Sequence, residues 1–233
     1  LNVTGILDGE GDRTDMTYDT HGNLLTRTEA ANSTAPGLPR TTTITYDGNA
    51  YNLPHTITVP GTGTCSNANR VTTLNYDSNG NMTSEQTTGC NGNSAFSHIK
   101  TFTYDSHGQI ASFNGPRDDS TDVLDKTIYD YYPDSDQNVP ANNWGRLKRI
   151  TDALGHQTTF AEYDLFGNVG SVTDPNDVKT SFLYDFLDHV TEKRIVGVPD
   201  EPVEDNIVTV YGYDAVGNLT SIRLPNCVAF SGC

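Results

Sequence analysis

One short phrase recurs along the chain with small changes: TYDTHGNLL at 17–25, NYDSNGNMT at 75–83, TYDSHGQIA at 103–111, EYDLFGNVG at 162–170 and GYDAVGNLT at 212–220. Each copy has Tyr-Asp, two variable residues, a glycine or its substitute, and a polar residue. A catalytic motif normally occurs once, so a recurring phrase indicates a structural unit. Tyr-Asp pairs lie at intervals of 21 to 34 residues, at 18–19, 46–47, 76–77, 104–105, 129–130, 163–164, 184–185 and 213–214. This period is typical of repeat proteins in which loops absorb the variation.

Each copy predicts two β-strands. Before the tyrosine runs a Thr-rich segment with an apolar residue at the second position upstream, and period two predicts a strand whose tyrosine shares that residue's face. These upstream residues are Met16, Ile44, Leu74, Phe102, Phe182 and Tyr211, with Thr127 and Ala161 in the remaining copies. The second strand starts on an apolar residue, which is Leu24, Leu53, Met82, Ile110, Leu147, Val169, Val190 or Leu219. No segment carries a helical apolar period, so we predict almost no helix.

The D-x-x-G segment between the two strands predicts a hairpin turn with a bulge. The aspartate can accept hydrogen bonds from backbone N–H groups two or three residues on, and the glycine supplies a positive φ. Asp188 replaces the glycine in one copy, and the copy with Ala50 has one extra residue. The residues predicted to build the repeat are Tyr18, Asp19, Gly22, Tyr76, Asp77, Gly80, Tyr104, Asp105, Gly108, Tyr163, Asp164, Gly167, Tyr184, Asp185, Tyr213, Asp214 and Gly217.

Composition favours a thin sheet over a thick core. Only 34% of the 233 residues are apolar, and the chain has 21 Gly and 11 Pro. We therefore predict an all-β fold of consecutive antiparallel hairpins, about eight in number, in a single array over residues 1–233. The hairpins would stack into a curved sheet, and the fifth would carry a long insertion at 131–144.

The charge balance excludes two classes of partner. With 30 acidic and 14 basic residues the net charge is −16, whereas binding to nucleic acid or an anionic membrane requires a basic surface. No apolar run approaches the length of a membrane span. The acidic loops 117–125 and 129–138 lack the spacing of an EF-hand, so we expect solvated loops, with no metal and no cofactor.

Four cysteines in a Lys-poor chain indicate an oxidising compartment. Three pairings are possible. A Cys65–Cys90 bridge would connect loops of adjacent repeats, and Cys227 would form a small ring with Cys233 unless Cys233 has a partner further along. A zinc site is disfavoured because the chain has no C-x-x-C pair.

The repeat unit resembles the YD-repeat, or Rhs, family. The segment GRLKRITDALGHQTTFAEYDLFGNVGSVTDPNDVKTSFLYD (145–185) fits the family pattern best, and the resemblance extends over the whole chain. In that family the hairpins coil into a spiral sheet that forms a hollow shell or barrel. Bacterial Rhs proteins and the B/C component of Tc toxins enclose a toxic C-terminal domain in it, and teneurins carry a similar barrel outside the cell. Both ends of the chain look cut from a longer protein.

The resemblance implies a structural scaffold and not an enzyme. The expected partner is an encapsulated C-terminal domain of the same polypeptide, in a secreted or cell-surface protein. Family members that release cargo cleave themselves at an aspartate, but Asp174–Pro175 and the segment 151–156 lack the extended motif, so we expect structural roles for both.

Other chemistry finds little support in the sequence. No G-x-S-x-G elbow is present, and the six histidines are scattered. The alternative to a scaffold is a carbohydrate- or cell-surface-binding module, in which Tyr131, Tyr132 and Trp144 beside the insertion would stack on a ligand. Large aromatic residues more often pack against their own sheet, and we expect that here.

Overall fold

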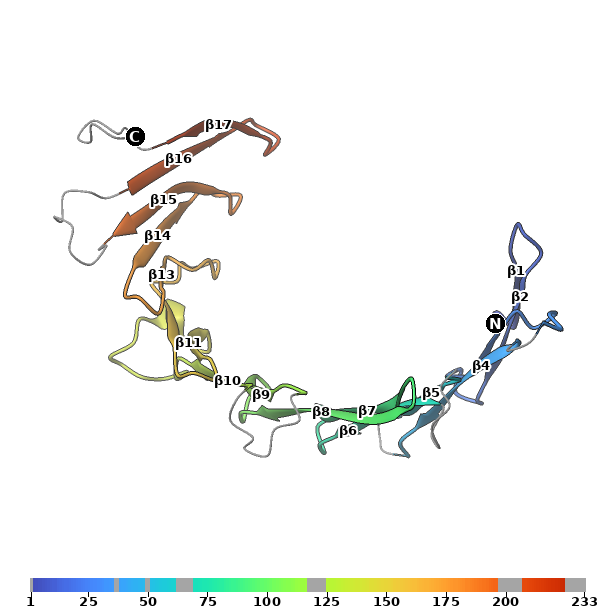
Figure 1. Cartoon of the computed structure of the whole chain (residues 1–233). Helices are drawn as coiled ribbons and strands as arrows, with labels where there is room; N and C mark the ends of the chain where they lie inside the picture. Colours follow the sequence, from blue (N-terminus) through green and yellow to red (C-terminus); the bar gives the residue numbers. More distant parts are fainter. Residues whose placement is uncertain are drawn as a thin grey trace. The chain divides into compact units, whose positions relative to one another are not determined.

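The computed structural model describes residues 2–35, 38–48, 51–61, 69–116, 125–196 and 207–224. Every regular element in these ranges is a β-strand, apart from a single turn of 3-10 helix. The chain divides after Lys126 into two units, and each unit consists of antiparallel strands that pair in chain order (Figure 1). The predictions of an all-β chain of consecutive hairpins with almost no helix are therefore confirmed.

The first unit is a meander of nine strands. Four of its hairpins, β2–β3, β4–β5, β6–β7 and β8–β9, are closed by the Tyr-Asp turns that the sequence predicts. The strands are β1 (Gly5–Leu7), β2 (Arg13–Tyr18), β3 (Leu24–Glu29), β4 (Arg40–Tyr46), β5 (Pro54–Val59), β6 (Arg70–Tyr76), β7 (Met82–Asn91), β8 (Ser94–Tyr104) and β9 (Ile110–Asn114).

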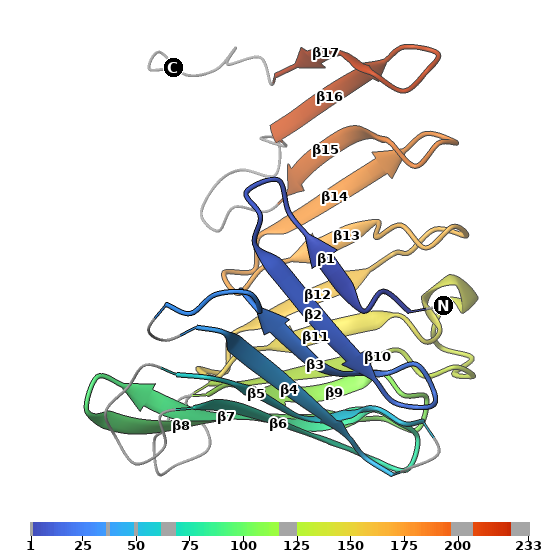
Figure 2. The same cartoon turned by 90° about the vertical axis from the view of Figure 1, so that its right-hand side faces the viewer.

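The second unit continues the same pattern, as its stacked strands in Figure 2 show. Tyr-Asp turns close β12–β13, β14–β15 and β16–β17, whereas a longer connection containing the 3-10 helix η1 joins β10 to β11. The elements are β10 (Lys126–Tyr131), η1 (Ala141–Asn143), β11 (Leu147–Thr151), β12 (Gln157–Ala161), β13 (Ser171–Thr173), β14 (Lys179–Tyr184), β15 (Val190–Val196), β16 (Ile207–Tyr213) and β17 (Leu219–Arg223).

The two faces of the first unit differ in chemistry because side chains alternate along a strand. One face carries apolar cross-strand pairs, such as Ile44 opposite Ile57 and Phe102 opposite Phe113, whose rings lie 5.3 Å apart. The other face carries hydroxyl pairs, of which Thr28–Thr41 has its Oγ1 atoms 2.9 Å apart. Cross-strand pairs of both kinds stabilise a sheet, which explains the Thr-rich strands.

No apolar side chain among the described residues is fully buried. The strand residues of the apolar face are mostly half-buried, with one side open. This confirms the prediction that the chain builds a thin sheet without a thick core. Each hairpin must therefore gain its stability from the hairpins beside it.

The register of the fifth hairpin corrects one prediction. In the ordinary hairpins the register shifts just before the turn tyrosine, as between Thr103 and Tyr104, so that Tyr104 pairs with Ile110. In β10–β11 the shift falls before Tyr131, which pairs with Leu147. The prediction that Tyr129–Asp130 fills the turn position is therefore wrong by two residues.

The residues displaced from the turn have other roles. The turn position that holds Tyr-Asp in the other hairpins holds Tyr131 and Tyr132 here. The displaced Asp130 lies within the strand instead, where its carboxylate pairs with Arg149 of the neighbouring strand at 2.7 Å. The sequence alone suggested otherwise because the Tyr-Asp dipeptide happens to occur two residues early.

Candidate functional site

The most regular feature of both units is a ladder of tyrosine hydroxyls. In each step, the Oη of a turn tyrosine donates a hydrogen bond to a backbone carbonyl oxygen of the preceding hairpin, at 2.8 to 3.1 Å. We call this set the tyrosine ladder: Tyr18 to Val3, Tyr46 to Leu24, Tyr76 to Pro54, Tyr104 to Met82, Tyr163 to Leu147, Tyr184 to Val169 and Tyr213 to Val190. The tyrosine is thus a tie between neighbouring repeats.

Each ladder tyrosine reaches back to the hairpin that precedes its own in the chain. The acceptor carbonyl generally belongs to the first residue of the preceding hairpin's second strand, as with Met82 at the start of β7. The ring of Tyr104 is half-buried, and desolvation raises the pKa of its hydroxyl, with a further contribution from the nearby Asp77 carboxylate. The hydroxyl therefore stays protonated and keeps donating at neutral pH.

The turn aspartate acts as a backbone clamp. Oδ1 of Asp77 accepts from the N–H groups of Asn79 and Asn81, at 2.8 and 2.9 Å, and the Asp77 N–H donates to the Asn81 carbonyl. The acceptor bonds thus reach two and four residues on, one further than predicted. Oδ2 of Asp77 accepts from the Asn81 side-chain amide at 3.0 Å, which explains the polar residue after each glycine.

Hydrogen bonding to the charged form stabilises the aspartates as anions. The side-chain amide of Asn81 is the largest cause that lowers the pKa of Asp77, followed by the backbone N–H of the same residue. Asp19 and Asp214 have lowered pKa values for the same first cause, from Asn23 and Asn218.

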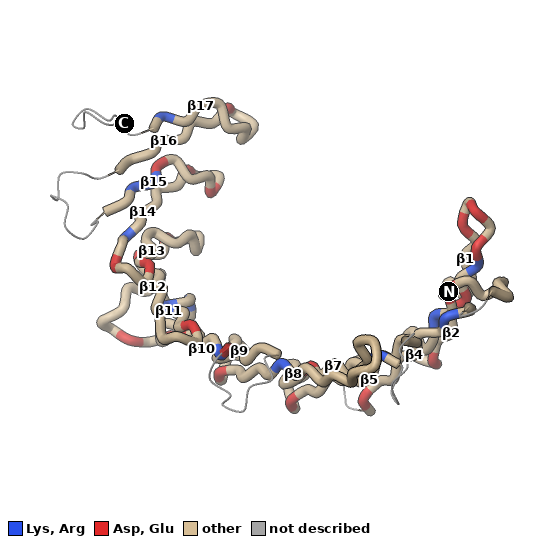
Figure 3. The backbone as a smooth tube through the Cα atoms, in the orientation of Figure 1, with Lys and Arg blue, Asp and Glu red and all other residues tan. Residues whose placement is uncertain are grey.

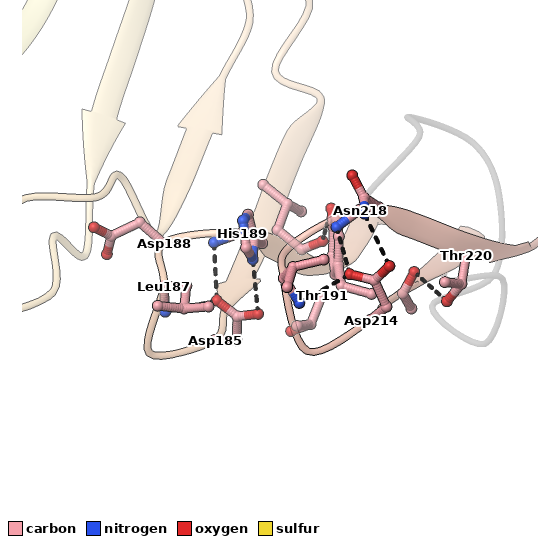
Figure 4. Close-up of polar contacts among 12 residues, drawn as sticks. Asp185, Leu187, Asp188, His189, Thr191, Asp214, Asn218 and Thr220 are labelled. Carbon is pink, nitrogen blue, oxygen red and sulfur yellow. Dashed lines mark hydrogen bonds and ion pairs between the residues drawn. The ribbon is translucent and has the colours of Figure 1, made fainter.

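Histidine replaces the asparagine in one of the Tyr-Asp turns. Nδ1 of His189 lies 3.1 Å from Oδ2 of Asp185, and the His189 ring stacks on Tyr213 of the next hairpin with centroids 4.6 Å apart. Figure 4 shows this turn beside that of Asp214 and Asn218. Desolvation opposes ionisation of Asp185, but the hydrogen bonds from His189 and Leu187 outweigh it, so the pKa of Asp185 is lowered.

The same turn also closes connections at the strand ends opposite the Tyr-Asp turns, where the sequence has no Tyr-Asp pair. Asp8, Asp152 and Asp174 each accept from the N–H groups two and four residues on. The signal was present in the sequence as D-G-E-G, D-A-L-G and D-P-N-D, without a preceding tyrosine. Asp174 therefore has a structural role as a turn residue.

The glycine position requires a left-handed backbone. Gly108 has a φ of +79° and Asp188, which replaces glycine in its turn, has +63°. In the longer turn after Asp47 the N–H of Leu53 donates to the aspartate, and Asn52 takes the positive φ of +49°. Ala50 lies outside the described residues.

The aromatic residues beside the insertion are engaged by the fold. The Tyr132 hydroxyl donates to the Phe160 carbonyl at 2.9 Å. The indole N–H of Trp144, a residue that is 40% exposed, points at the carbonyls of Asp136 and Val139 at 3.3 and 3.1 Å. Tyr131 occupies the turn-tyrosine position. All three aromatic residues therefore take part in the fold of the fifth hairpin, its insertion or the strand β12 beside it.

Cys90 lies in β7 and is bonded in a disulfide. Cys65, Cys227 and Cys233 lie outside the described residues, so the predicted connectivity stays a prediction. The acidic loop 117–125 is also undescribed apart from Asp125. Within the described ranges, no three His, Cys, Asp or Glu side chains gather as a metal site would require.

A groove of about 1380 Å³ lies on the apolar face of the first unit, and its lining includes Arg40, Arg70, Glu85, Phe96 and Lys100. Most of its charged side chains form ion pairs or hydrogen bonds within the same unit. Lys100 pairs with Glu85 at 3.0 Å, and Arg40 donates to the Pro60 carbonyl at 2.8 Å. The groove shows no nucleophile–base pair.

Acidic residues recur at the hairpin turns, where Figure 3 shows them in red. Among the described residues, no helix is long and apolar enough to cross a bilayer.

Comparison with known proteins supports the structural interpretation. A family model described as RHS Repeat matches residues 142–179. The structure of the Photorhabdus luminescens Tc holotoxin pore with the mutation TccC3-D651A is similar over 96% of this chain and 12% of that chain, at 14% identity and a TM-score of 0.53. The crystal structure of TcdB2-TccC3-Cdc42 is similar over 94% of this chain and 12% of that chain, at 15% identity and a TM-score of 0.51.

The chain thus spans about an eighth of the length of the solved chains it matches. At these identities the likeness concerns the fold. A search of curated proteins gives no match. The family model covers one repeat, and the tyrosine ladder and aspartate turns recur through the other copies with the same geometry. Residues 142–179 thus match the RHS Repeat family, and the rest of the chain repeats the same hairpin and shares the fold of the Tc toxin structures.

Proposed function

We propose that the chain is a non-catalytic scaffold, a stretch of the wall of a YD-repeat shell that encapsulates or presents a C-terminal domain of a secreted or surface protein. The tyrosine ladder is the observation that carries this proposal. Within each unit it ties hairpins to the ones before them, in a sheet where no described apolar residue is fully buried. Such hairpins are stable only in a row, and a row of hairpins makes a wall.

The chemistry of the recurring residues supports the same function. The tyrosine hydroxyls donate to backbone carbonyls, and the aspartate carboxylates accept from backbone N–H groups. The glycines adopt the positive φ that the turns require. A repeat that uses its polar groups in this way holds a shape, and this favours a scaffold over an enzyme.

A protease-protection experiment tests the proposal in the full-length protein. The C-terminal domain predicted to follow the repeats should resist a protease concentration that digests the same domain expressed alone. Tyr104→Ala, which breaks one tie of the ladder, should reduce the protection, while Tyr211→Phe should leave it unchanged. Equal digestion of the domain with and without the repeats would contradict encapsulation.

The alternative function, carbohydrate or cell-surface binding through Tyr131, Tyr132 and Trp144, has one favourable observation, the 40% exposure of Trp144. It is the weaker proposal because the Tyr132 hydroxyl and the Trp144 indole N–H are bonded within the second unit. A glycan array decides between them, since binding that disappears in Trp144→Ala would favour this alternative.

A further inference from the structure

Three neighbouring turns of the second unit expose large apolar side chains at their tips. The two variable positions between the aspartate and the glycine site hold Leu165 and Phe166, then Phe186 and Leu187, then Ala215 and Val216. Phe166 is 76% exposed, Phe186 85% and Val216 82%, and Leu165 is exposed to a similar degree. We call the five large residues, Leu165, Phe166, Phe186, Leu187 and Val216, the tip row.

The turn itself does not require apolar residues there. Only the backbone of these positions takes part in the clamp: the N–H of Phe166 donates to Asp164, that of Leu187 to Asp185 and that of Val216 to Asp214. In the first unit, the equivalent positions of three turns are polar, namely Thr20 and His21, Ser78 and Asn79, and Ser106 and His107. Contiguous exposed apolar surface marks interaction sites.

Contacts between the turns hold the tip row together. The three hairpins are neighbours in the sheet, because β13 pairs with β14 and β15 with β16. The Asn168 amide donates to Asp188 of the next turn at 2.7 Å, and the His189 ring stacks on Tyr213 of the third hairpin. At two strands per step the tips repeat every ~10 Å, so the row is about 20 Å long and its members are presented in fixed order.

The charges around the tip row decide what can dock on it. The carboxylates of Asp164, Asp185, Asp188 and Asp214 lie in the same three turns. Hydrogen bonds lower the pKa of Asp164, Asp185 and Asp214 against the opposing effect of desolvation, so these groups are ionised at neutral pH. The Arg146 guanidinium of the preceding turn is engaged by the Asn142 carbonyl and lies over the Tyr163 ring.

An acidic rim around an apolar row disfavours two obvious occupants. A second copy of this chain carries a net charge of −16 and the same acidic turns, so the two copies repel each other. An anionic lipid surface is repelled for the same reason. A polypeptide with both apolar and basic side chains complements this surface, because its apolar groups can pack on the tip row while its lysines or arginines pair with the aspartates.

We propose that the tip row is a docking surface for a cationic amphipathic polypeptide segment. The segment would place its apolar side chains on Phe166, Phe186 and Val216 and its cations beside the turn aspartates. This function is additional to the scaffold, since the tip side chains contribute nothing to the turn hydrogen bonds.

The test uses two labelled amphipathic peptides of about 18 residues, one of Leu and Lys and one of Leu and Glu in the same order. Fluorescence anisotropy measures their binding to the chain and to the variant Phe166→Asn/Phe186→Ser/Val216→Asn, which copies the polar tips of the first unit. We expect the Leu/Lys peptide to bind the chain at least tenfold more tightly than the variant, and the Leu/Glu peptide not to bind.

Leu154→Ser is the matched control, because Leu154 is 75% exposed in a turn of the same type at the opposite edge. This variant should bind the Leu/Lys peptide as the parent does, and all variants should keep the parent melting temperature. Equal binding of the peptide by parent and tip variant, or no binding by the parent, overturns the proposal. Neither result bears on the scaffold proposal, because the protease experiment tests that proposal separately.

Discussion

The hydroxyl of Tyr104 donates a hydrogen bond to the backbone carbonyl of Met82, 2.9 Å away and 22 residues earlier in the chain. Because these residues belong to consecutive hairpins, the bond converts a local sequence motif into a contact between repeats. The same step occurs in both units, so the tyrosine of the Tyr-Asp pair adds a side-chain tie to the backbone pairing between neighbouring hairpins.

Removing that hydroxyl should weaken the sheet measurably. Tyr104→Phe keeps the ring but removes the hydrogen bond to the Met82 carbonyl, and we expect a loss of about 1 kcal/mol in the free energy of unfolding. Urea denaturation measures it. Tyr211→Phe is the control, since the Tyr211 hydroxyl has no hydrogen-bond partner among the described residues. Equal losses for the two variants would show that the ladder does not stabilise the fold.

Removing the whole Tyr104 side chain should cost more. The ring is half-buried, so Tyr104→Ala should lose about 2–3 kcal/mol, which is the hydrogen bond plus part of the value for burial of an aromatic ring. Replacing a fully buried aromatic residue by alanine typically costs more, roughly 3–5 kcal/mol. A loss as large as that for a fully buried ring would contradict the open face of the sheet.

Substitutions at Gly108 should follow backbone preference and not size. A Cβ at Gly108 meets nothing within 4 Å, but φ is +79°. Gly108→Asn should be tolerated best and Gly108→Ala should cost about 1 kcal/mol, while Gly108→Val should cost more because a β-branched residue rarely adopts a positive φ. Thermal melts give the order, and a Val variant as stable as the Asn variant would refute the turn assignment.

The residue after the glycine should accept histidine but not aspartate. Asn81→His should preserve the clamp, because His189 makes the equivalent contact with Asp185, whereas Asn81→Asp places a second carboxylate beside Oδ2 of Asp77. We expect a lower melting temperature at neutral pH for Asn81→Asp alone. If a higher salt concentration does not raise the melting temperature of Asn81→Asp, repulsion between the carboxylates is not the cause.

Acid should destabilise the chain through its turns. The lowered pKa values of Asp19, Asp77 and Asp214 mean that the unfolded chain binds protons more readily. Their contribution to stability is therefore present above the unfolded pKa near roughly 3.9 and is lost as the pH falls through the folded values. Melting temperatures from pH 7 downward should decline in this window, and Asp77→Asn should flatten the decline.

Alkali should destabilise the chain through the ladder. Desolvation raises the pKa of Tyr76, Tyr104 and Tyr184, with a smaller effect of neighbouring aspartates. Their contribution is fully present below the unfolded pKa near ~10 and is lost as the pH rises through the folded values. Tyrosinate absorbance should appear together with unfolding above this pH. A Tyr104→Phe variant with an unchanged pH dependence would contradict the assignment.

The repeat pattern was enough to predict the strands and turns. Period-two alternation around Tyr104 and the D-x-x-G signal after it are local properties, and a hairpin turn is decided within a few residues of chain. The thin sheet also followed, because the apolar content is too low for a thick core. These are the parts of the fold that backbone conformation and side-chain alternation determine on their own.

Other features depended on contacts between residues far apart in the chain. The partner of the Tyr104 hydroxyl is a carbonyl of the preceding repeat, and nothing in the motif identifies it. The fifth hairpin shows the same limit, because only strand register reveals that Tyr131 and not Tyr129 occupies the turn position. The tip row likewise arises only when successive hairpins bring Phe166, Phe186 and Val216 to one edge.

The sequence by itself therefore determined that the chain repeats a hairpin with a Tyr-Asp turn, because alternation and turn chemistry act over a few residues. The tertiary structure decided how each hairpin is tied to the next and which side chains remain exposed at the edge. The physical reason is that the tyrosine ladder joins residues 15 to 23 positions apart in different hairpins, and pairing between strands is set by their mutual fit.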